Sequence, residues 1–396
     1  MFPSRRVIFS GGEKFKNEYS VAFDGTDDNI RIPEIEYNVD GSTVSFVFWL
    51  KRAAIGATQV IIGHTSSNGN SFMRFNSSNE IKFESDTNGD VATVTQNTID
   101  TEWHHYVITA SSGTVTAYQD GVVCSVSGNV GDDNFTINTI GGSGTNGVDN
   151  EFNGTISEIA AYDIAFTSSQ AKEIYNDREP FDHKNWSKTG NLTQWWRFGD
   201  GKFDGNRILT DEANPTRQAE LLANPTIDSN TTGWNGYAGG GDENTLARET
   251  SITHNGDGSL KITFVADNGG WVGSAVSAVT GVANKLIVFE GWCYIPTNSY
   301  AFDDIFFTDG SGFGGASAET TAKRAVPGTA NVWQFIRTMS IPVSGDTSGA
   351  FYIYTSGTDP SAGDIIYFDD LSARVYNGAT GQMYNMSQSD FVGDTP

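Results

Sequence analysis

The sequence predicts an all-β protein made of two tandem antiparallel β-sandwiches of the jelly-roll type, joined by an ordered connector. Three observations favour this fold class. The 396 residues exceed what one hydrophobic core usually organises. Short runs of alternating apolar and polar residues recur along the chain, and each ends at Gly, Asn or Asp. The composition, with 45 glycines and 12% aromatic residues, supplies both turns and core side chains.

The first half of the chain carries seven such runs and one helical pattern. The runs lie at 20–23, 43–50, 60–64, 71–75, 81–84, 103–109 and 114–119. A helix is expected at 167–177, where Thr167 or Ser168 could cap its start and Ala171, Ile174 and Tyr175 would share one face. We therefore expect a sandwich over 19–178, preceded by an arm at 1–18.

The second half repeats the strand pattern after a different intervening segment. Residues 179–220 include Trp186, Trp195 and Trp196, which a flexible linker would not carry, so they are expected to form an ordered connector. Further alternating runs at 260–264, 286–295, 302–307, 332–341, 350–355 and 365–375 predict a second sandwich over 221–376. The polar segment 377–396 is expected to be a tail or an assembly arm.

The charge balance excludes some partners. The net charge is −24, and a surface of this sign repels nucleic acid and anionic membranes. It suits neutral ligands such as sugars, and Ca²⁺ held by carboxylates.

No apolar stretch is long enough to predict membrane insertion, and no secretion signal is visible in the first residues. Cys124 and Cys293 fall in different predicted domains, so two buried free thiols are expected rather than a disulfide.

The first predicted sandwich resembles the laminin-G-like (concanavalin A-like) jelly rolls. The resemblance covers essentially the whole domain and is carried by YSVAFDGTDD at 19–28, VSFVFWL at 44–50, EWHHYV at 102–107, YQDG at 118–121 and FNGTISEI at 152–159. Many members bind Ca²⁺, which implies a site made by Asp24, Asp27 and Asp28 with Glu158 or Asp149. The alternative is that these aspartates only shape a turn.

The pair His104 and His105 suggests a metal or a base, but its spacing argues otherwise. Neighbouring side chains in a strand point to opposite faces, so the two imidazoles cannot converge on one ion. The family has a similar Trp-His-His on an interior strand. Both histidines are therefore expected to be structural.

The second predicted sandwich resembles carbohydrate-binding modules of the family-four/family-nine type. The matching segments are LLANPTID at 221–228, TGW at 232–234, GDGSLKI at 256–262, FEGW at 289–292, WQF at 333–335 and IYFDDLS at 366–372. The resemblance implies a structural Ca²⁺ held by Asp228 and Asp369, although the segment around Asp228 departs from the family's Gly-Gly-Phe-Glu pattern.

Sugar binding needs aromatic faces that stack on the apolar faces of a pyranose, with polar groups for its hydroxyls. The candidates in predicted loops or on an exposed strand face are Trp271, Trp234, Tyr237, Tyr300, Tyr352 and Tyr354. Trp271, after the turn-forming residues 268–270, is the leading candidate. Each could instead belong to the core, and Trp292 and Trp333 match family positions that are mostly structural.

Two further segments resemble bacteriophage virion-associated proteins, namely TQWWRFGDG at 193–201 and MSQSDFVGDTP at 386–396. This resemblance implies a decoration, fibre or tail-associated adhesin on the virion exterior. Its partners would be glycans and other virion proteins, docked through the N- or C-terminal segment. Assembly that follows particle symmetry, such as a trimer, would fit.

No enzyme is expected. A glycosidase needs two positioned carboxylates, and Glu34–Glu36 and 149–151 look like loops rather than a catalytic strand. A nucleophile elbow and a phosphate loop are also missing from the sequence. Two alternatives remain open: a bacterial cell-surface polysaccharide-binding protein, and a purely architectural virion protein without a ligand.

Overall fold

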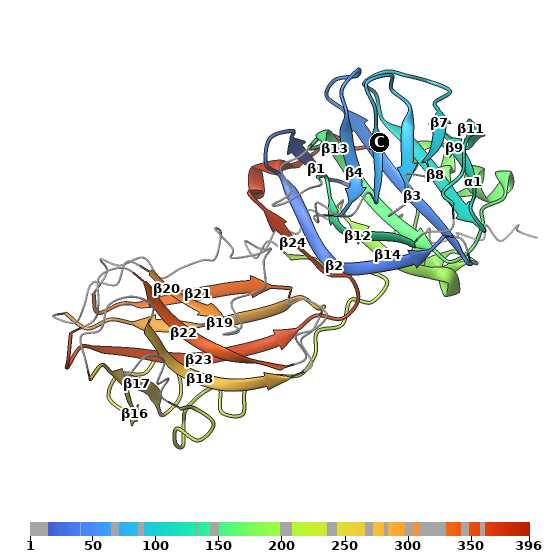
Figure 1. Ribbon diagram of the computed structural model, residues 1–396. Helices are drawn as coiled ribbons and strands as arrows, with labels where there is room; N and C mark the ends of the chain where they lie inside the picture. Colours follow the sequence, from blue (N-terminus) through green and yellow to red (C-terminus); the bar gives the residue numbers. More distant parts are fainter. Residues whose placement is uncertain are drawn as a thin grey trace, which may run out of the picture.

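The computed structural model confirms the all-β prediction: the chain forms two sandwiches of antiparallel sheets (Figure 1). The structure describes residues 15–39, 41–64, 71–85, 91–131, 134–142, 150–198, 208–235, 244–265, 272–280, 284–297, 304–308, 330–341, 348–356 and 361–396. Both cysteines are buried free thiols, as expected. Within the described residues, every helix is too short or too polar to cross a membrane.

One sheet of the first sandwich has eight strands, in the order β10-β9-β8-β3-β13-β1-β25, with β14 also paired to β13. Its strands are β1 (Ser20–Asp24), β3 (Thr43–Arg52), β8 (His104–Ser111), β9 (Thr114–Gln119), β10 (Val122–Val123), β13 (Asn153–Tyr162), β14 (Leu192–Arg197) and β25 (Phe391–Val392). β1 and β14 pair with successive parts of β13, because β1 ends its pairing at Ile156 and β14 begins at Glu158.

The facing sheet has nine strands, in the order β11-β7-β6-β5-β4-β12-β2-β24-β15. Its strands are β2 (Asn29–Asn38), β4 (Gln59–Gly63), β5 (Phe72–Phe75), β6 (Ile81–Glu84), β7 (Val91–Thr95), β11 (Ser125–Ser127), β12 (Asn134–Ile140), β15 (Ile208–Leu209) and β24 (Gly381–Tyr384). Apolar side chains from the inner faces of both sheets form one core, which includes Phe46, Phe83 and Phe135.

The strand β2 was not predicted, and residues Glu34–Glu36 lie in it rather than in a loop. Pro33 hides this strand in the sequence, because proline lacks the N–H that a ladder needs. The structure accommodates it at an irregularity: β2 pairs with β12 through Arg31 and again from Ile35, and the register shifts in between. Proline therefore sits where the hydrogen-bond ladder is already interrupted.

The outer face of the eight-stranded sheet is covered by the helix and the connector. The helix α1 (Ser168–Tyr175) is the predicted one, and the Thr167 side chain caps it in a capping box with Gln170. Ala171 and Ile174 pack with Trp186 and Trp195 in a second cluster on this face. Residues 179–198 are thus part of the first sandwich, and they bury their tryptophans against it.

The second sandwich consists of a five-stranded sheet, β16-β17-β23-β19-β21, and a three-stranded sheet, β18-β22-β20. The strands are β16 (Thr245–Glu249), β17 (Ser259–Thr263), β18 (Val272–Thr280), β19 (Ile287–Tyr294), β20 (Asp304–Thr308), β21 (Trp333–Ser340), β22 (Ser348–Ser356) and β23 (Ile365–Val375). A separate core lies behind the five-stranded sheet and includes Phe289, Cys293, Ile336 and Phe368.

The C-terminal segment 377–396, which was expected to be a tail or an assembly arm, returns to the first sandwich. β24 pairs with both β2 and β15, and β25 pairs with β1. Met383 and Met386 are buried in the first core. Figure 1 shows the red C-terminal end lying against the blue strands of the chain's beginning. The second sandwich is therefore inserted between two adjacent strands of the first, β15 and β24.

The two passages of chain between the sandwiches run side by side. Arg217 and Tyr376 form an antiparallel bridge, and the Gln218 amide donates to the Val375 carbonyl at 2.8 Å. The Asn377 amide donates to the Thr216 carbonyl at 2.9 Å. We call residues 216–218 and 375–377 the neck.

Candidate functional site

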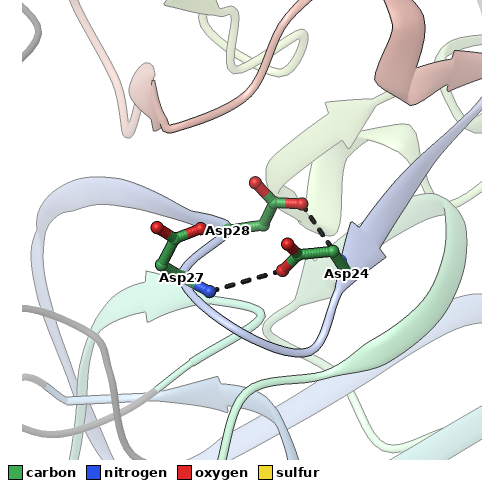
Figure 2. A group of neighbouring side chains, drawn as sticks. All are labelled: Asp24, Asp27 and Asp28. Atoms are coloured by element: carbon green, nitrogen blue, oxygen red, sulfur yellow. Dashed lines mark hydrogen bonds between the residues drawn. The ribbon is translucent and has the colours of Figure 1, made fainter.

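Three carboxylates gather at the turn between β1 and β2 (Figure 2). Ligand atoms of Asp24, Asp27 and Asp28 all lie within 4.8 Å of one another. The turn itself accounts for part of this order. Asp24 Oδ1 accepts hydrogen bonds from the amides of Thr26 and Asp27, and Asp28 Oδ2 accepts one from the Asp24 amide at 3.0 Å. The predicted Asx-turn chemistry and the predicted clustering are thus both present.

The electrostatics of this turn favour a cation. Burial raises the pKa of Asp28 to about 7, and the negative charges of Asp24, Asp390 and Asp27 add to this rise, while the hydrogen bond from the Asp24 amide opposes it. A divalent cation would relieve this repulsion, and Ca²⁺ takes carboxylate and carbonyl oxygens as ligands. The acidic cluster therefore fits a metal such as Ca²⁺, in which case Asp24, Asp27 and Asp28 would hold it.

Glu158 and Asp149 were the further ligands expected for this site. The group of mutually close carboxylates comprises only the three aspartates within the described residues, and it does not include Glu158. Glu158 is instead buried, with Oε2 accepting a hydrogen bond from Trp195 Nε1 at 3.2 Å. Asp149 lies outside the described residues. The structure thus separates Glu158 from the acidic turn.

Asp228 and Asp369, the predicted metal pair of the second sandwich, both hold the segment 254–257. Asp369 Oδ2 accepts hydrogen bonds from the amides of His254 and Asn255, and Asp228 Oδ1 accepts one from the Asp257 amide at 2.7 Å. Burial raises the pKa of Asp369, whereas the hydrogen bond from the Asp257 amide is the first cause that lowers the pKa of Asp228. The two carboxylates therefore already tie a loop to the sheet through backbone donors.

Of the six aromatic residues predicted to bind sugar, the structure describes the side chain of Trp234. It is buried in the second core, with its indole N–H donating to the Asn224 carbonyl at 2.9 Å. Its side chain is thus not presented to a ligand. Tyr237, Trp271 and Tyr300 lie outside the described residues. Tyr352 and Tyr354 lie in β22, but their side chains are not described.

An aromatic platform that the sequence reasoning missed covers the five-stranded sheet on the face away from the core. We define it by six residues: His254, Trp292, Tyr294, Trp333, Phe335 and Tyr367. Trp292 and Tyr294 alternate in β19 with the core residues Phe289 and Cys293. The register places Tyr294 between Trp333 and Tyr367 on the neighbouring strands.

The rings of the platform contact one another. His254 stacks on Trp292 with ring centroids 4.0 Å apart and an interplanar angle of 15°. Tyr294 meets Trp333 at 5.5 Å and Tyr367 at 5.9 Å. Trp292, Tyr294, Trp333 and Phe335 are all partly exposed. Alternation in 286–295 places Trp292 and Tyr294 on the face opposite to Phe289 and Cys293. The matches of Trp292 and Trp333 to mostly structural family positions kept both tryptophans out of the candidates.

Charged pairs border the platform. Glu290 accepts hydrogen bonds from Arg337, through Nε at 2.8 Å and through Nη2, and the Arg337 guanidinium also lies 5.2 Å from the Phe335 ring centroid. His254 Nδ1 lies 2.7 Å from Asp370 Oδ2. Polar groups held in fixed positions beside aromatic faces are what a hydroxylated ligand needs.

His104 and His105 take different structural roles, as their spacing predicted. His104 hydrogen-bonds Asp120 at 2.7 Å and Asp100 at 2.9 Å. His105 is buried against Trp49, and this burial lowers its pKa to about 3. A neutral, fully buried imidazole supports packing rather than proton transfer.

The comparisons with known proteins agree with the architecture of the first sandwich. The family model of the concanavalin A-like lectin/glucanases superfamily matches residues 24–172. No curated protein matches the chain.

Among solved structures, a candidate carbohydrate-binding protein from Bacteroides ovatus is 15% identical, with a TM-score of 0.38, over 51% of this chain and 57% of that one. The CBM22-1 xylan-binding domain from Paenibacillus barcinonensis is 15% identical, with a TM-score of 0.27, over 39% of this chain and 93% of that one. The enzymatically active domain of bacteriophage CBA120 tailspike protein 4 is 14% identical, with a TM-score of 0.27, over 40% of this chain and 21% of that one.

The chain thus spans little more than half of the Bacteroides protein. The family model matches the first sandwich from β2 to β13 in sequence. Residues 24–172 therefore form a concanavalin A-like lectin/glucanase domain.

Proposed function

We propose that this chain is a non-catalytic glycan-binding protein and that the aromatic platform of the second sandwich is its ligand site. The observation that carries the proposal is the row of partly exposed rings on β19 and β21, namely Trp292, Tyr294, Trp333 and Phe335. Aromatic side chains in a sheet usually turn inward, and exposing several on one face sacrifices burial. Such a face is best explained by a ligand that covers it.

A sugar chain fits this surface better than an apolar partner. Ring faces stack on the C–H faces of pyranoses, and the neighbouring pairs Glu290–Arg337 and His254–Asp370 supply acceptors and donors for hydroxyls. A purely apolar partner would remove water from both charged pairs. It would offer no polar group to replace the hydrogen bonds that these pairs make with water.

The proposal assigns no hydrolytic step to the platform. Hydrolysis of a glycosidic bond needs one carboxyl group that donates a proton and a second that acts from the other side. Here Glu290 is held by Arg337, and Asp370 is hydrogen-bonded to His254. Carboxylates fixed in this way suit the recognition of hydroxyl groups.

The test is a glycan-array screen of the full chain, in Ca²⁺ and in chelator, followed by variants. Trp333→Ala should weaken binding of any hit by at least about fivefold, since a stacked ring contributes roughly 1 kcal/mol beyond its buried area. Tyr19→Ala is the matched control, because this exposed tyrosine lies on the first sandwich. Equal binding by both variants and the unaltered chain would remove the platform from the proposal.

We further propose that the protein is displayed on the exterior of a phage particle. The support is the resemblance of 193–201 and 386–396 to virion-associated proteins, together with the acidic composition. Residues 386–396 pack on the first sandwich through β25. We therefore propose that the N-terminal segment binds the other virion proteins. Mass spectrometry of purified particles tests this part independently of glycan binding. If the protein binds glycans but is not found in purified particles, a cell-surface protein is favoured. If it is found in particles but binds no glycan, an architectural virion protein is favoured.

A further inference from the structure

A cavity of about 200 Å³ lies in the first sandwich, far in the sequence from the platform. Its inner wall is made by Asn17, Trp49 and Glu158, where the eight-stranded sheet meets the segment before β1. Its other lining residues are exposed or half-buried, namely Arg178, Glu179, Pro180, Thr395 and Pro396. The acidic turn is not part of it.

The carboxylate of Glu158 is the most unusual group in this wall. The residue is only 2% exposed, and β13 carries it beneath the connector. Oε2 accepts one hydrogen bond, from the neutral indole of Trp195. Oε1 lies 3.6 Å from His183 Nε2, which is beyond hydrogen-bond distance, while His183 Nδ1 is engaged with the Tyr162 hydroxyl at 2.5 Å. Among the described residues, the indole N–H of Trp195 is the donor within hydrogen-bond distance of this carboxylate, and His183 lies within ion-pair distance. A further donor or cation would add to the compensation for its lost hydration.

Asn17 adds a buried acceptor to this wall. Its side chain is 9% exposed, and its Nδ2 donates to Ser157 Oγ, the residue beside Glu158. Its Oδ1 is buried without a hydrogen-bond partner among the described residues. The inner wall therefore combines one buried acceptor without a partner among the described residues, Asn17 Oδ1, with the Glu158 carboxylate and with Trp49.

We propose that this cavity binds the ammonium-bearing ring of a small amino sugar. An ammonium group donates three hydrogen bonds, which matches the acceptors of Glu158 and Asn17, and its charge compensates the buried carboxylate. Trp49 also lines the cavity and would contact the sugar ring. The volume is smaller than the roughly 300 Å³ at which pockets for drug-sized ligands begin, so it limits the ligand to about one monosaccharide.

The proposal is tested by isothermal titration calorimetry of the full chain with D-glucosamine at slightly acidic pH. D-Glucose and N-acetyl-D-glucosamine are the matched neutral probes. Glucosamine should bind saturably at one site, and the neutral sugars should bind at least about tenfold more weakly, because charge-assisted hydrogen bonds are roughly twice as strong as neutral ones.

Two variants locate the site, and two controls exclude other sites. Glu158→Gln keeps the shape of the wall but removes its charge, and it should weaken glucosamine binding by at least about tenfold. Asn17→Ala should weaken binding by a smaller factor, and it keeps the test decisive if the Glu158 variant melts early. Glu36→Gln changes an exposed carboxylate on the opposite sheet and should have no effect. Trp333→Ala should also leave this binding unchanged, which separates the cavity from the platform.

Three results would overturn the proposal. One is the absence of saturable glucosamine binding to the folded chain, which would mean that His183 alone compensates Glu158. Another is equal affinity for glucosamine and glucose. The third is a Glu158→Gln or Asn17→Ala variant, shown folded by circular dichroism, that binds glucosamine as the unaltered chain does.

Discussion

The carboxyl group of Asp28, in the turn between β1 and β2, has a raised pKa that makes the stability of the fold depend on pH. Its folded pKa of about 7 lies well above that of an unfolded aspartate, so the folded chain holds an additional proton between about pH 4 and pH 7. Without metal, the free energy of unfolding should therefore fall as the pH rises across this interval, because the folded state binds more protons than the unfolded one.

This pH dependence leads to a prediction about Ca²⁺. Added Ca²⁺ should raise the melting temperature more above about pH 7 than near pH 5, since the cation competes with the proton on Asp28. Thermal melts with Ca²⁺ or chelator at several pH values would measure this. Asp28→Asn should flatten the dependence, whereas Asp257→Asn, at an exposed position of the second sandwich, should not. A Ca²⁺ effect that is equal at all pH values would contradict the assignment.

At the scale of elements, the short strand β24 has more influence than its length suggests. It lies between β2 and β15, and its Met383 is 1% exposed in the first core. Met383→Ala should lower the free energy of unfolding by about 2–5 kcal/mol, because the cavity left behind adds to the lost burial. Denaturant titration checks this. Gln388→Ala, on the exposed turn that follows, is the control. If both variants unfold alike, β24 is not part of the cooperative core.

The platform is also a property of elements. β19 pairs with β21 on one side and β23 on the other, which brings Trp292, Trp333 and Tyr367 into one face. Their positions in the chain give no hint of this neighbourhood. Alternation places Trp292 and Tyr294 on one face of their strand, and only the order of strands in the sheet revealed which aromatic side chains share that face.

At the scale of the whole molecule, the insertion of the second sandwich determines which parts can fold alone. In the neck, the Gln218 amide donates a hydrogen bond to the Val375 carbonyl, with 2.8 Å between nitrogen and oxygen. Replacing residues 219–374 by a short Gly-rich loop should therefore leave a folded first sandwich, because a hairpin-length connection spans this gap. Ending the chain at residue 218 should instead prevent stable folding, since it removes β24 and β25.

Circular dichroism and thermal melts of the two shortened chains measure this difference. A cooperative transition in both chains would show that the C-terminal strands are dispensable. The absence of a transition in both would mean that the first sandwich needs the second, for which the contact between the Asn284 side chain and the Glu34 backbone offers a route.

The sequence by itself determined the class of fold and much of its local structure. Period-two alternation, the capped helix after Thr167 and the clustering of Asp24, Asp27 and Asp28 are local features, set by backbone geometry over a few residues. The tertiary structure alone decided where Glu158 points, that Trp234 is in the core, that 381–392 completes the first sandwich, and which aromatics share a face. These depend on strand pairings between segments far apart in the chain. Strand preference reflects packing against cross-strand neighbours, and the local pattern of one sequence does not identify those neighbours.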